Sequence, residues 1–414
     1  NFLAVNNQQV ENAWLLANGV DTTAGKSWDN AWTFLESNVV TETTFAGYLQ
    51  ANIDITLGDM QLYGNFGTRV IRSEQRSTGL QSSAEPGTGD CITDDFGVEN
   101  CNYDAVEQGI EYTDVLPSMN LNLKMTDEDQ LRFSMARVMA RPEMPDMRVG
   151  GTWVFGDPRD NIRYVDFSAN TSPALRPFYA VQYDLSYEHY FSETEGAFIA
   201  ALFYKDIRST VQQYSQPDFD FASIGMEVPA VNPQTEVPVT PGNYSAKFNN
   251  GEGGYVRGAE LAYTQTFGFL PEPFNGLGFT GNVSYTESEL KNQFTAVQGA
   301  VPETSPLPGL SKVVWSAAVF YDYNDVFSTR MNVRYRDDYI GDQIALGQAQ
   351  QAFFQEELIV DFQASYQFND TFQGVFSVSN ITDEPNISYF GAEYNTGTIQ
   401  YYGRQYYLGV NAKF

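Results

Sequence analysis

The sequence predicts an all-β protein, an antiparallel transmembrane β-barrel with long extracellular loops and short periplasmic turns. Apolar and polar residues alternate at a period of two over segments of about 12–15 residues. Tight turns and long loops alternate between these segments, and aromatic residues make up 15 % of the chain. Strands of this length can cross a bilayer at a tilt, whereas strands of soluble sheets usually have about five or six residues.

The clearest alternation spans residues 43–57. Phe45, Leu49 and Ile53 fall on one face, and polar residues dominate the other. A Gly58-Asp59 turn follows, and residues 60–70 continue the alternation, which is typical of a β-hairpin. The next connection is expected to be a loop of about forty residues that contains both cysteines.

The same alternation of tight turn and long loop continues to the end of the chain. The further expected strands are 115–125, 130–141, 178–191, 197–208, 255–268, 277–287, 313–323, 326–336, 358–368, 371–381 and 399–414. With the first hairpin this makes about 13 strands. If the tight turns are periplasmic, the odd count also places Phe414 in the periplasm.

An odd number of strands indicates part of a larger barrel, because bacterial single-chain barrels have even strand numbers and no free edges. Residues 1–42 include AWLLANG and WDNAWTFLES, and we expect them to form a short helical or irregular extracellular loop segment at a truncated N-terminus. Residues 43–414 are then the C-terminal part of the barrel.

Charge and cysteine content limit the partners. The chain has 52 acidic and 23 basic residues, which argues against nucleic acid. Cys91 and Cys101 lie close together in CITDDFGVENC and are expected to form a disulfide, with two free thiols as the alternative. No cofactor is expected, except that this acidic loop is a candidate Ca²⁺ site or a bridge to lipopolysaccharide, with a solvated loop as the alternative. The candidate ligands are Asp94, Asp95, Glu99 and Asp104.

Six segments carry a family resemblance. They are LPSMNLNLKMTDEDQLRFSMARVMARPEM (116–144), SPALRPFYAVQYDLSYEHYF (172–191), ALFYKDI (201–207), VRGAELAYTQ (256–265), LPGLSKVVWSAAVFY (307–321) and VSNITDEP (378–385). Their order and spacing resemble the barrel of TonB-dependent receptors of Gram-negative outer membranes, particularly the large receptors of Caulobacter-type and related marine proteobacteria. Ser172 departs from the family pattern, which usually has Asn there.

The resemblance implies a 22-stranded barrel with an N-terminal plug in the cell outer membrane, in contact with lipid and lipopolysaccharide. It implies active uptake of a scarce nutrient, energised by the TonB complex through a region outside this chain. It also implies that the outer-membrane insertion machinery recognises the C-terminal strand through Tyr406, Leu408, Val410 and Phe414. Oligosaccharide is the expected cargo. The alternatives are siderophore-iron uptake, a passive porin and a secreted carbohydrate-binding β-protein.

Cargo contacts are expected in the long loops and the upper lumen. The segment GGTWVFGDPRDN combines aromatic rings with planar polar groups, which suits sugar rings, although its aromatics also suit loop packing or an aromatic girdle. Its candidate residues are Trp153, Phe155, Asp157, Arg159 and Asp160. Arg330 and Arg334 are candidates for an anionic solute, but pairing with lumen carboxylates such as Asp361 is favoured.

No enzyme activity is expected. His189 is the only histidine of the chain and falls on the same face as Tyr187 and Phe191, near a predicted periplasmic turn. This position favours a residue of the interfacial aromatic girdle over a general base or metal ligand.

Overall fold

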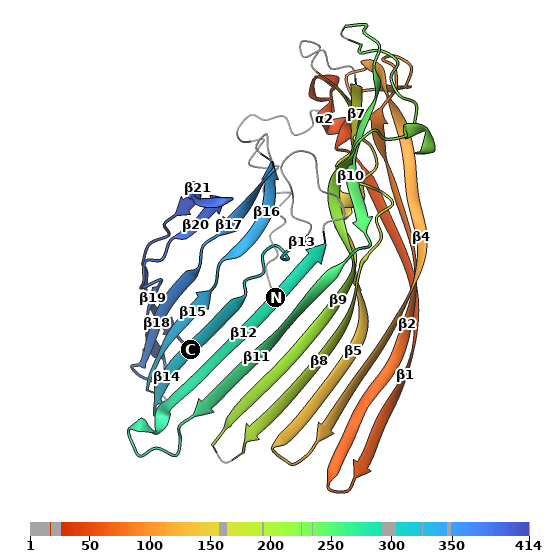
Figure 1. The fold of residues 1–414 in the computed structure, drawn as a ribbon. Helices are drawn as coiled ribbons and strands as arrows, with labels where there is room; N and C mark the ends of the chain where they lie inside the picture. The colour runs from red at the N-terminus through yellow and green to blue at the C-terminus, as the bar shows by residue number, and fades with distance from the viewer. Residues whose placement is uncertain are drawn as a thin grey trace.

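Thirteen antiparallel strands of the described residues form one continuous, curved wall (Figure 1). The computed structural model describes residue 17 and residues 26–156, 164–192, 194–224, 226–233, 235–291, 304–324, 326–345 and 349–413. In sheet order, the wall strands are β1 (Val39–Leu57), β2 (Met60–Ser82), β4 (Glu99–Lys124), β5 (Asp129–Ala140), β8 (Phe178–Phe191), β9 (Gly196–Gln216), β11 (Gly254–Thr266), β12 (Leu277–Lys291), β14 (Val313–Tyr323), β15 (Phe327–Arg336), β18 (Glu357–Gln367), β19 (Phe372–Ser379) and β22 (Gln405–Ala412). Each pairs antiparallel with the next. The predicted fold class and strand number are confirmed.

Shorter elements decorate one end of the wall. Five strands join the same sheet: β3 (Asp90–Thr93), β6 (Thr152–Phe155), β7 (Tyr164–Ser168), β10 (Thr240–Asn250) and β13 (Thr304–Ser305). A second sheet contains β16 (Tyr339–Ala345), β17 (Ala349–Phe354), β20 (Asn386–Phe390) and β21 (Ala392–Gln400). The short helices η1 (Trp28–Asn30), α2 (Trp32–Leu35), η2 (Met144–Met147) and η4 (Phe221–Ile224) belong to the same end, whereas η5 (Phe274–Gly276) lies in the connection between β11 and β12 at the opposite end. No helix in the described residues is long and apolar enough to span a membrane.

One face of the wall carries exposed apolar side chains in rows. Strand pairing puts Leu185 opposite Leu202, and Leu261 opposite Val283. Such a band on an antiparallel barrel is the surface that meets lipid, and we call it the lipid-side face. The opposite, lumen-side face carries charged residues such as Arg330.

The two ends of the wall differ as the sequence predicted. Short turns join the strands at one end, at the bottom of Figure 1, and the long connections lie at the other end. The turn between β1 and β2 needs only two residues because Gly58 has a φ of +65°, a conformation that glycine adopts without strain.

The expected forty-residue loop after β2 is wrong. β2 and β4 pair without interruption from Gln61–Lys124 to Ser82–Tyr103, so the connection shrinks to residues 83–98. The strand extension escaped prediction because neither of its faces is apolar. Arg72, Glu74 and Arg76 lie on one face, and the other carries buried polar residues such as Ser73.

The bounds predicted for the closing strand, residues 399–414, are also wrong, because two strands of different sheets share this segment. β21 ends at Gln400 in the second sheet, and β22 begins at Gln405 in the wall. Gly403 has a φ of +72°, and Arg404 Nε donates a hydrogen bond to the backbone oxygen of Ile381 at 2.8 Å. The chain therefore turns at residues 401–404, which takes Tyr402 out of the wall. Phe414 lies outside the described residues.

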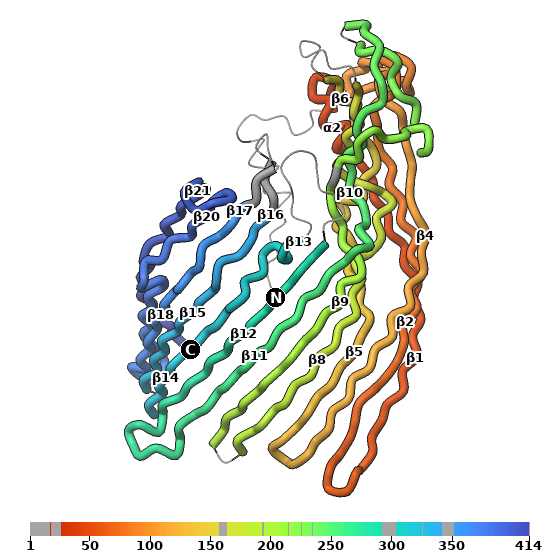
Figure 2. The backbone as a smooth tube through the Cα atoms, in the orientation of Figure 1, coloured from red at the N-terminus to blue at the C-terminus, as the bar shows by residue number. Residues whose placement is uncertain are grey.

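The packed apolar core lies in the external loops rather than in the wall. The most buried apolar side chains are those of Met147, Val165, Phe167, Leu175, Phe221 and Ala246, each at most 2 % exposed. They belong to or adjoin η2, β7, η4 and β10. These elements stand at the long-loop end of the wall (Figure 2), where β7 pairs with both β6 and β10. This packed unit positions the candidate site.

Candidate functional site

The external loops enclose a pocket of about 720 Å³, which we call the loop pocket. Its floor is the upper part of β2 and β4, and its walls come from the segments 167–175, 219–224 and 244–249 and from Met226. Its lining includes the aromatic side chains of Phe167, Phe219, Tyr244 and Phe248 and the polar side chains of Gln81, Glu107, Gln108, Lys247 and Asn249.

Strand β10 places two of the aromatic rings in the pocket. It pairs in parallel with β7 and antiparallel with β9, so its residues 244, 246 and 248 share a face. The Phe219 ring lies 4.8 Å from that of Tyr244, and Tyr244 lies edge to face against Phe248 at 5.7 Å. The Phe219 N–H donates to the Gly242 oxygen at 3.0 Å, which fixes η4 beside β10.

Trp153 supports the pocket from behind. Its ring packs edge to face against Phe167 at 4.9 Å and against Phe221 at 5.2 Å. Phe221 is only 1 % exposed, so these three rings form the centre of the loop core. Of the three, Phe167 also lines the pocket.

The charged residues of the loop pocket are paired with neighbours. Lys247 Nζ lies 2.5 Å from Asp146 Oδ1, and Glu107 Oε1 accepts a hydrogen bond from Arg76 Nη1 at 3.0 Å. Burial raises the pKa of Tyr244, so its phenol stays neutral at ordinary pH. The side-chain amides of Gln81 and Gln108 have no hydrogen-bond partner within the described part of the chain. The pocket thus offers ring faces and neutral hydrogen-bonding groups.

The predicted cargo segment is described only in part. Trp153 and Phe155 lie on β6, which pairs with β7, while Asp157, Arg159 and Asp160 lie outside the described residues. A role of this segment in cargo contact stays a prediction.

The two predicted arginines lie elsewhere. Arg330 and Arg334 are on the lumen-side face of β15, on a different part of the wall from β6 (Figure 2). Arg334 Nη2 bonds to Asp361 Oδ2 at 3.2 Å, in agreement with the favoured interpretation. The structure therefore does not bring the two predicted groups together.

The cysteine loop is organised by a disulfide and by Asp94. Cys91 on β3 is bonded to Cys101 on β4, as predicted. Asp94 Oδ1 accepts hydrogen bonds from the N–H groups of Val98 at 2.8 Å and Phe96 at 2.9 Å. Its Oδ2 accepts one from the Trp28 N–H at 3.3 Å. Burial alone would raise the pKa of Asp94, but these amides together lower it.

The four predicted calcium ligands do not converge. Asp95 Oδ2 accepts a hydrogen bond from the Lys26 N–H at 2.9 Å. Both carboxylate oxygens of Asp94 already accept hydrogen bonds from backbone amides. Across the described residues, the only cluster with metal-ligand spacing is Cys91, Glu99 and Cys101, and its two sulfurs form the disulfide. The calcium site with Asp94, Asp95, Glu99 and Asp104 stays a prediction.

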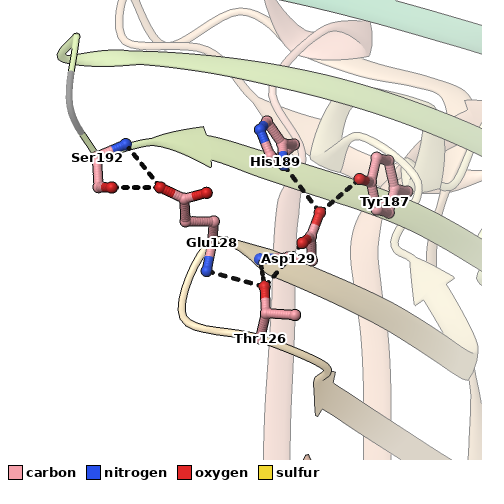
Figure 3. Close-up of polar contacts among 6 residues, drawn as sticks. All are labelled: Thr126, Glu128, Asp129, Tyr187, His189 and Ser192. Atoms are coloured by element: carbon pink, nitrogen blue, oxygen red, sulfur yellow. Dashed lines mark hydrogen bonds and ion pairs between the residues drawn. The ribbon is translucent and has the colours of Figure 1, made fainter.

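His189 belongs to a polar network at the tight-turn end of the wall (Figure 3). Its Nδ1 lies 2.8 Å from Asp129 Oδ1, which also accepts a hydrogen bond from the Tyr187 hydroxyl at 2.6 Å. The Ser192 hydroxyl bonds to Glu128 instead of to His189. The network joins the turn before β5 to the end of β8, an arrangement that stabilises the turn and offers no serine–histidine pair.

The C-terminal strand lies at the edge of the described wall. Tyr406, Leu408 and Val410 on β22 are exposed on the lipid-side face, opposite Val378, Phe376 and Gly374 of β19. Recognition of these residues and Phe414 by the insertion machinery stays a prediction.

Sequence reasoning missed the aromatic residues of the loop pocket. The strands predicted at 197–208 and 255–268 left the residues between them as one of the long loops, although Phe219 and Phe221, and Tyr244 and Phe248, have even spacings typical of one face of an extended segment. That spacing was the only signal in the sequence that pointed to a pocket here.

Comparisons with known proteins agree with this architecture. The family model for the β-barrel of TonB-dependent receptor-like proteins matches residues 5–381. A search of curated proteins found no match.

Three solved structures illustrate the similarity. The ferric-catecholate import receptor Fiu from E. coli is 16 % identical over 91 % of this chain and 45 % of its own, with a TM-score of 0.58. The ferric yersiniabactin uptake receptor FyuA from Yersinia pestis is 14 % identical over 91 % and 46 %, with a TM-score of 0.55. The FrpB iron transporter from Neisseria meningitidis is 15 % identical over 98 % and 49 %, with a TM-score of 0.52.

At these identities the similarity shows the fold alone, and the chain spans about half the length of the solved structures. The family model, in contrast, covers most of the chain and selects a receptor over a porin or a secreted β-protein. The chain therefore belongs to the TonB-dependent receptors, outer-membrane β-barrel proteins of Gram-negative bacteria.

Proposed function

We propose that this chain is the barrel portion of a receptor that takes up an oligosaccharide across the outer membrane with energy from the TonB complex. The family supports the class of transporter. β1 and β22 each pair with only one wall strand among the described residues, so further strands and a plug are proposed to complete the barrel.

The loop pocket carries the proposal for the cargo. Sugar rings stack their C–H faces on aromatic rings and exchange hydrogen bonds through their hydroxyl groups. Phe219, Tyr244 and Phe248 supply such rings, and Gln81 and Gln108 supply amides. The charged groups nearby are paired, and the whole chain has a net charge of −29. Such surroundings favour a neutral cargo over an anionic one.

A ferric siderophore is the second candidate, because the three solved receptors above are named for iron transport. Ferric catecholates carry net negative charge, since each catecholate is doubly deprotonated. Such a cargo requires a cation in the pocket, and Lys247 is the cation that lines it.

A binding experiment separates the two. The complete receptor, purified in detergent, is titrated calorimetrically with neutral oligosaccharides of different linkage and with a ferric tris-catecholate. We expect an oligosaccharide to bind and Phe219→Ala to weaken it about tenfold or more, because one stacking surface is lost. Phe269→Ala is the matched control, since Phe269 lies in the tight-turn connection between β11 and β12 and outside the pocket.

The Lys247→Gln variant tests whether the pocket binds a neutral or an anionic cargo. The variant should leave oligosaccharide binding nearly unchanged, because the lysine is already paired with Asp146. Binding of the catecholate alone, together with its loss in Lys247→Gln, would overturn the oligosaccharide proposal in favour of siderophore uptake.

A further inference from the structure

One edge of β4 is paired at both ends and unpaired between them. Toward the long loops, β3 pairs with β4 at residues 99–103, and nearer the membrane β5 pairs with residues 118–124. On its other side, β4 pairs with β2 without a break from Tyr103 to Lys124. We call residues 107–115 of β4 the open edge. They belong to the extension of the wall, which forms the right-hand margin of Figure 1.

The packing at Gly109 shows where the backbone groups of the open edge point. A Cβ atom at Gly109 would lie 2.0 Å from the Gln75 oxygen and 2.9 Å from the Arg76 Cα atom. Gly109 and Arg76 are directly opposite each other, and such a close approach is typical of a non-hydrogen-bonded antiparallel pair. In such a pair the N–H and C=O groups point away from the partner strand. The backbone groups of Gly109, and of every second residue from it, therefore point away from β2.

Ala105, four residues before Gly109, agrees with this direction. Its N–H donates to Asp90 Oδ2 at 2.9 Å, and Asp90 belongs to β3, on the side of β4 that faces away from β2. The residues of the open edge in the same phase are all exposed, and they are Glu107, Gly109, Glu111, Thr113 and Val115. Their backbone N–H and C=O groups have no hydrogen-bond partner within the described part of the chain.

Such an edge is a template for another strand. Natural proteins often protect an exposed edge with lysine or proline, and neither residue occurs between residues 106 and 116. The open edge therefore offers a ladder of donors and acceptors whose length is set by β3 at one end and β5 at the other. A ligand that matches this ladder has the same alternation of N–H and C=O groups, which is the backbone of an extended peptide.

The outer face of the open edge is acidic and has a hollow of about 290 Å³ at Gly109. Glu107 and Glu111 flank the hollow, and their side chains are 56 % and 52 % exposed. Arg76 reaches only Glu107 Oε1, at 3.0 Å. Arg72 reaches only Glu111 Oε2, at 2.8 Å. The second oxygen of each carboxylate has no partner among the described residues, and three carboxylates face two arginines here, so one negative charge is in excess.

We propose that the open edge binds an extended cationic peptide by strand addition, antiparallel to β4. The direction follows from β3 and β5, which both run antiparallel to β4 on this same edge. Basic side chains opposite Glu107 and Glu111 meet the free carboxylate oxygens, and a large side chain between them fills the hollow over Gly109. The ligand class is a peptide with two basic residues four positions apart and a large residue midway. The inference does not depend on the cargo.

The probe is a ten-residue peptide of alternating threonine and valine, with lysine at its fifth and ninth positions and tryptophan at its seventh. Its binding to the complete receptor in detergent is measured by fluorescence anisotropy. N-methylation of its third, fifth and seventh residues removes the donors that face β4 and should weaken binding about tenfold or more. N-methylation of the fourth, sixth and eighth residues is the matched control and should have little effect. Glutamate in place of both lysines should also weaken binding about tenfold or more.

The Thr113→Pro variant tests the same contact from the receptor. Proline removes the outward N–H and places its ring on the open edge, while the ladder with β2 is kept because this N–H points away from β2. Peptide binding should fall about tenfold, whereas Thr113→Ala, which keeps the N–H, should bind normally.

Three results would overturn the proposal: no binding of the unmethylated peptide, equal weakening by the two methylation patterns, or equal binding of the lysine and glutamate peptides. Equal weakening by Thr113→Pro and Thr113→Ala would do the same. If Thr113→Pro does not assemble, the methylated peptides decide the question on the unchanged receptor.

Discussion

At the level of single residues, Asp94 connects two segments that are distant in the sequence. Its carboxylate accepts hydrogen bonds from backbone amides of its own turn and from Trp28, while the Trp28 ring stacks on Tyr103 with centroids 5.5 Å apart. An acidic residue expected as a metal ligand therefore works as the acceptor that closes a turn. The segment at residues 26–37 is held on the cysteine loop through it.

We predict that Asp94→Ala releases this segment. Lys26 is the only lysine or arginine before Arg69, so trypsin cleavage after Lys26 reports the state of the segment specifically. Cleavage should become several times faster, because the amides of Phe96, Val98 and Trp28 lose their acceptor. Asp104→Ala, on the adjoining strand β4, should leave the rate unchanged, and equal acceleration in both variants would contradict this role of Asp94.

The pH dependence of the same contact has a definite sign. The pKa of Asp94 is lower in the folded loop than in the unfolded chain. Its stabilising effect is therefore complete above the ordinary aspartate value of about 4 and is lost as pH falls through the lowered value. In fluorotryptophan-labelled receptor, we expect the Trp28 resonance to move to its position in Asp94→Ala only in that acidic range. A transition at about pH 6–7, where histidine titrates, would show that another group controls the segment.

At the level of elements, β10 and η4 act together as the support of the loop pocket. Phe221 of η4 packs between Trp153 of β6 and Tyr244 of β10, with centroids at 5.2 and 6.0 Å. Three segments from two connections, the one between β5 and β8 and the one between β9 and β11, are thereby joined around one ring. The pocket depends on this packing, since Phe219 and Tyr244 line it.

We predict that Phe221→Ala opens the loop unit and spares the wall. Removing a phenylalanine that is 1 % exposed costs about 3–5 kcal/mol. Hydrogen exchange measured by mass spectrometry should become faster in β10 and η4, whereas β5 and β8 should keep their protection. Phe96→Ala is the matched control, because Phe96 is 66 % exposed in another external loop. Unchanged exchange in β10 would show that the ring does not hold the unit together.

At the level of the whole molecule, the alternation of faces assigns each wall residue to lipid or lumen. Leu202 and Ala201 are neighbours on β9 with opposite assignments. Leu202 pairs with Leu185 and is 57 % exposed on the lipid-side face. Ala201 pairs with Ser186 and Glu260 on the lumen-side face.

An arginine scan of this pair tests the assignment. Leu202→Arg should destabilise the receptor in lipid vesicles by about 2–4 kcal/mol, the cost of an arginine facing hydrocarbon near the bilayer centre. Ala201→Arg should have a much smaller effect, because its side chain enters the hydrated lumen near Glu260. The free energy of unfolding follows from urea titrations of both variants. A larger loss for Ala201→Arg would reverse the two faces.

The wall was predictable because lipid requires an apolar residue at every second position, and this period is visible within ten residues of sequence. Strands such as β14 and β15 fall where the alternation placed them, at Val313–Tyr323 and Phe327–Arg336. The extension of β2 and β4 has no such requirement, because it meets water on one face and a packed loop on the other. The local sequence therefore contains no apolar–polar alternation from which this extension could be predicted.

Residues that are near neighbours in the chain encode the membrane-spanning strands, their inward and outward faces, and the positions of the tight turns. The loop pocket and the use of Asp94 as a turn acceptor, in contrast, arise only when the chain folds. These features depend on contacts between residues far apart, such as Gln75 Nε2 with the Pro173 oxygen at 2.8 Å and Lys247 with Asp146 at 2.5 Å. No periodicity encodes such pairs, because only the folded loops bring them within hydrogen-bonding distance.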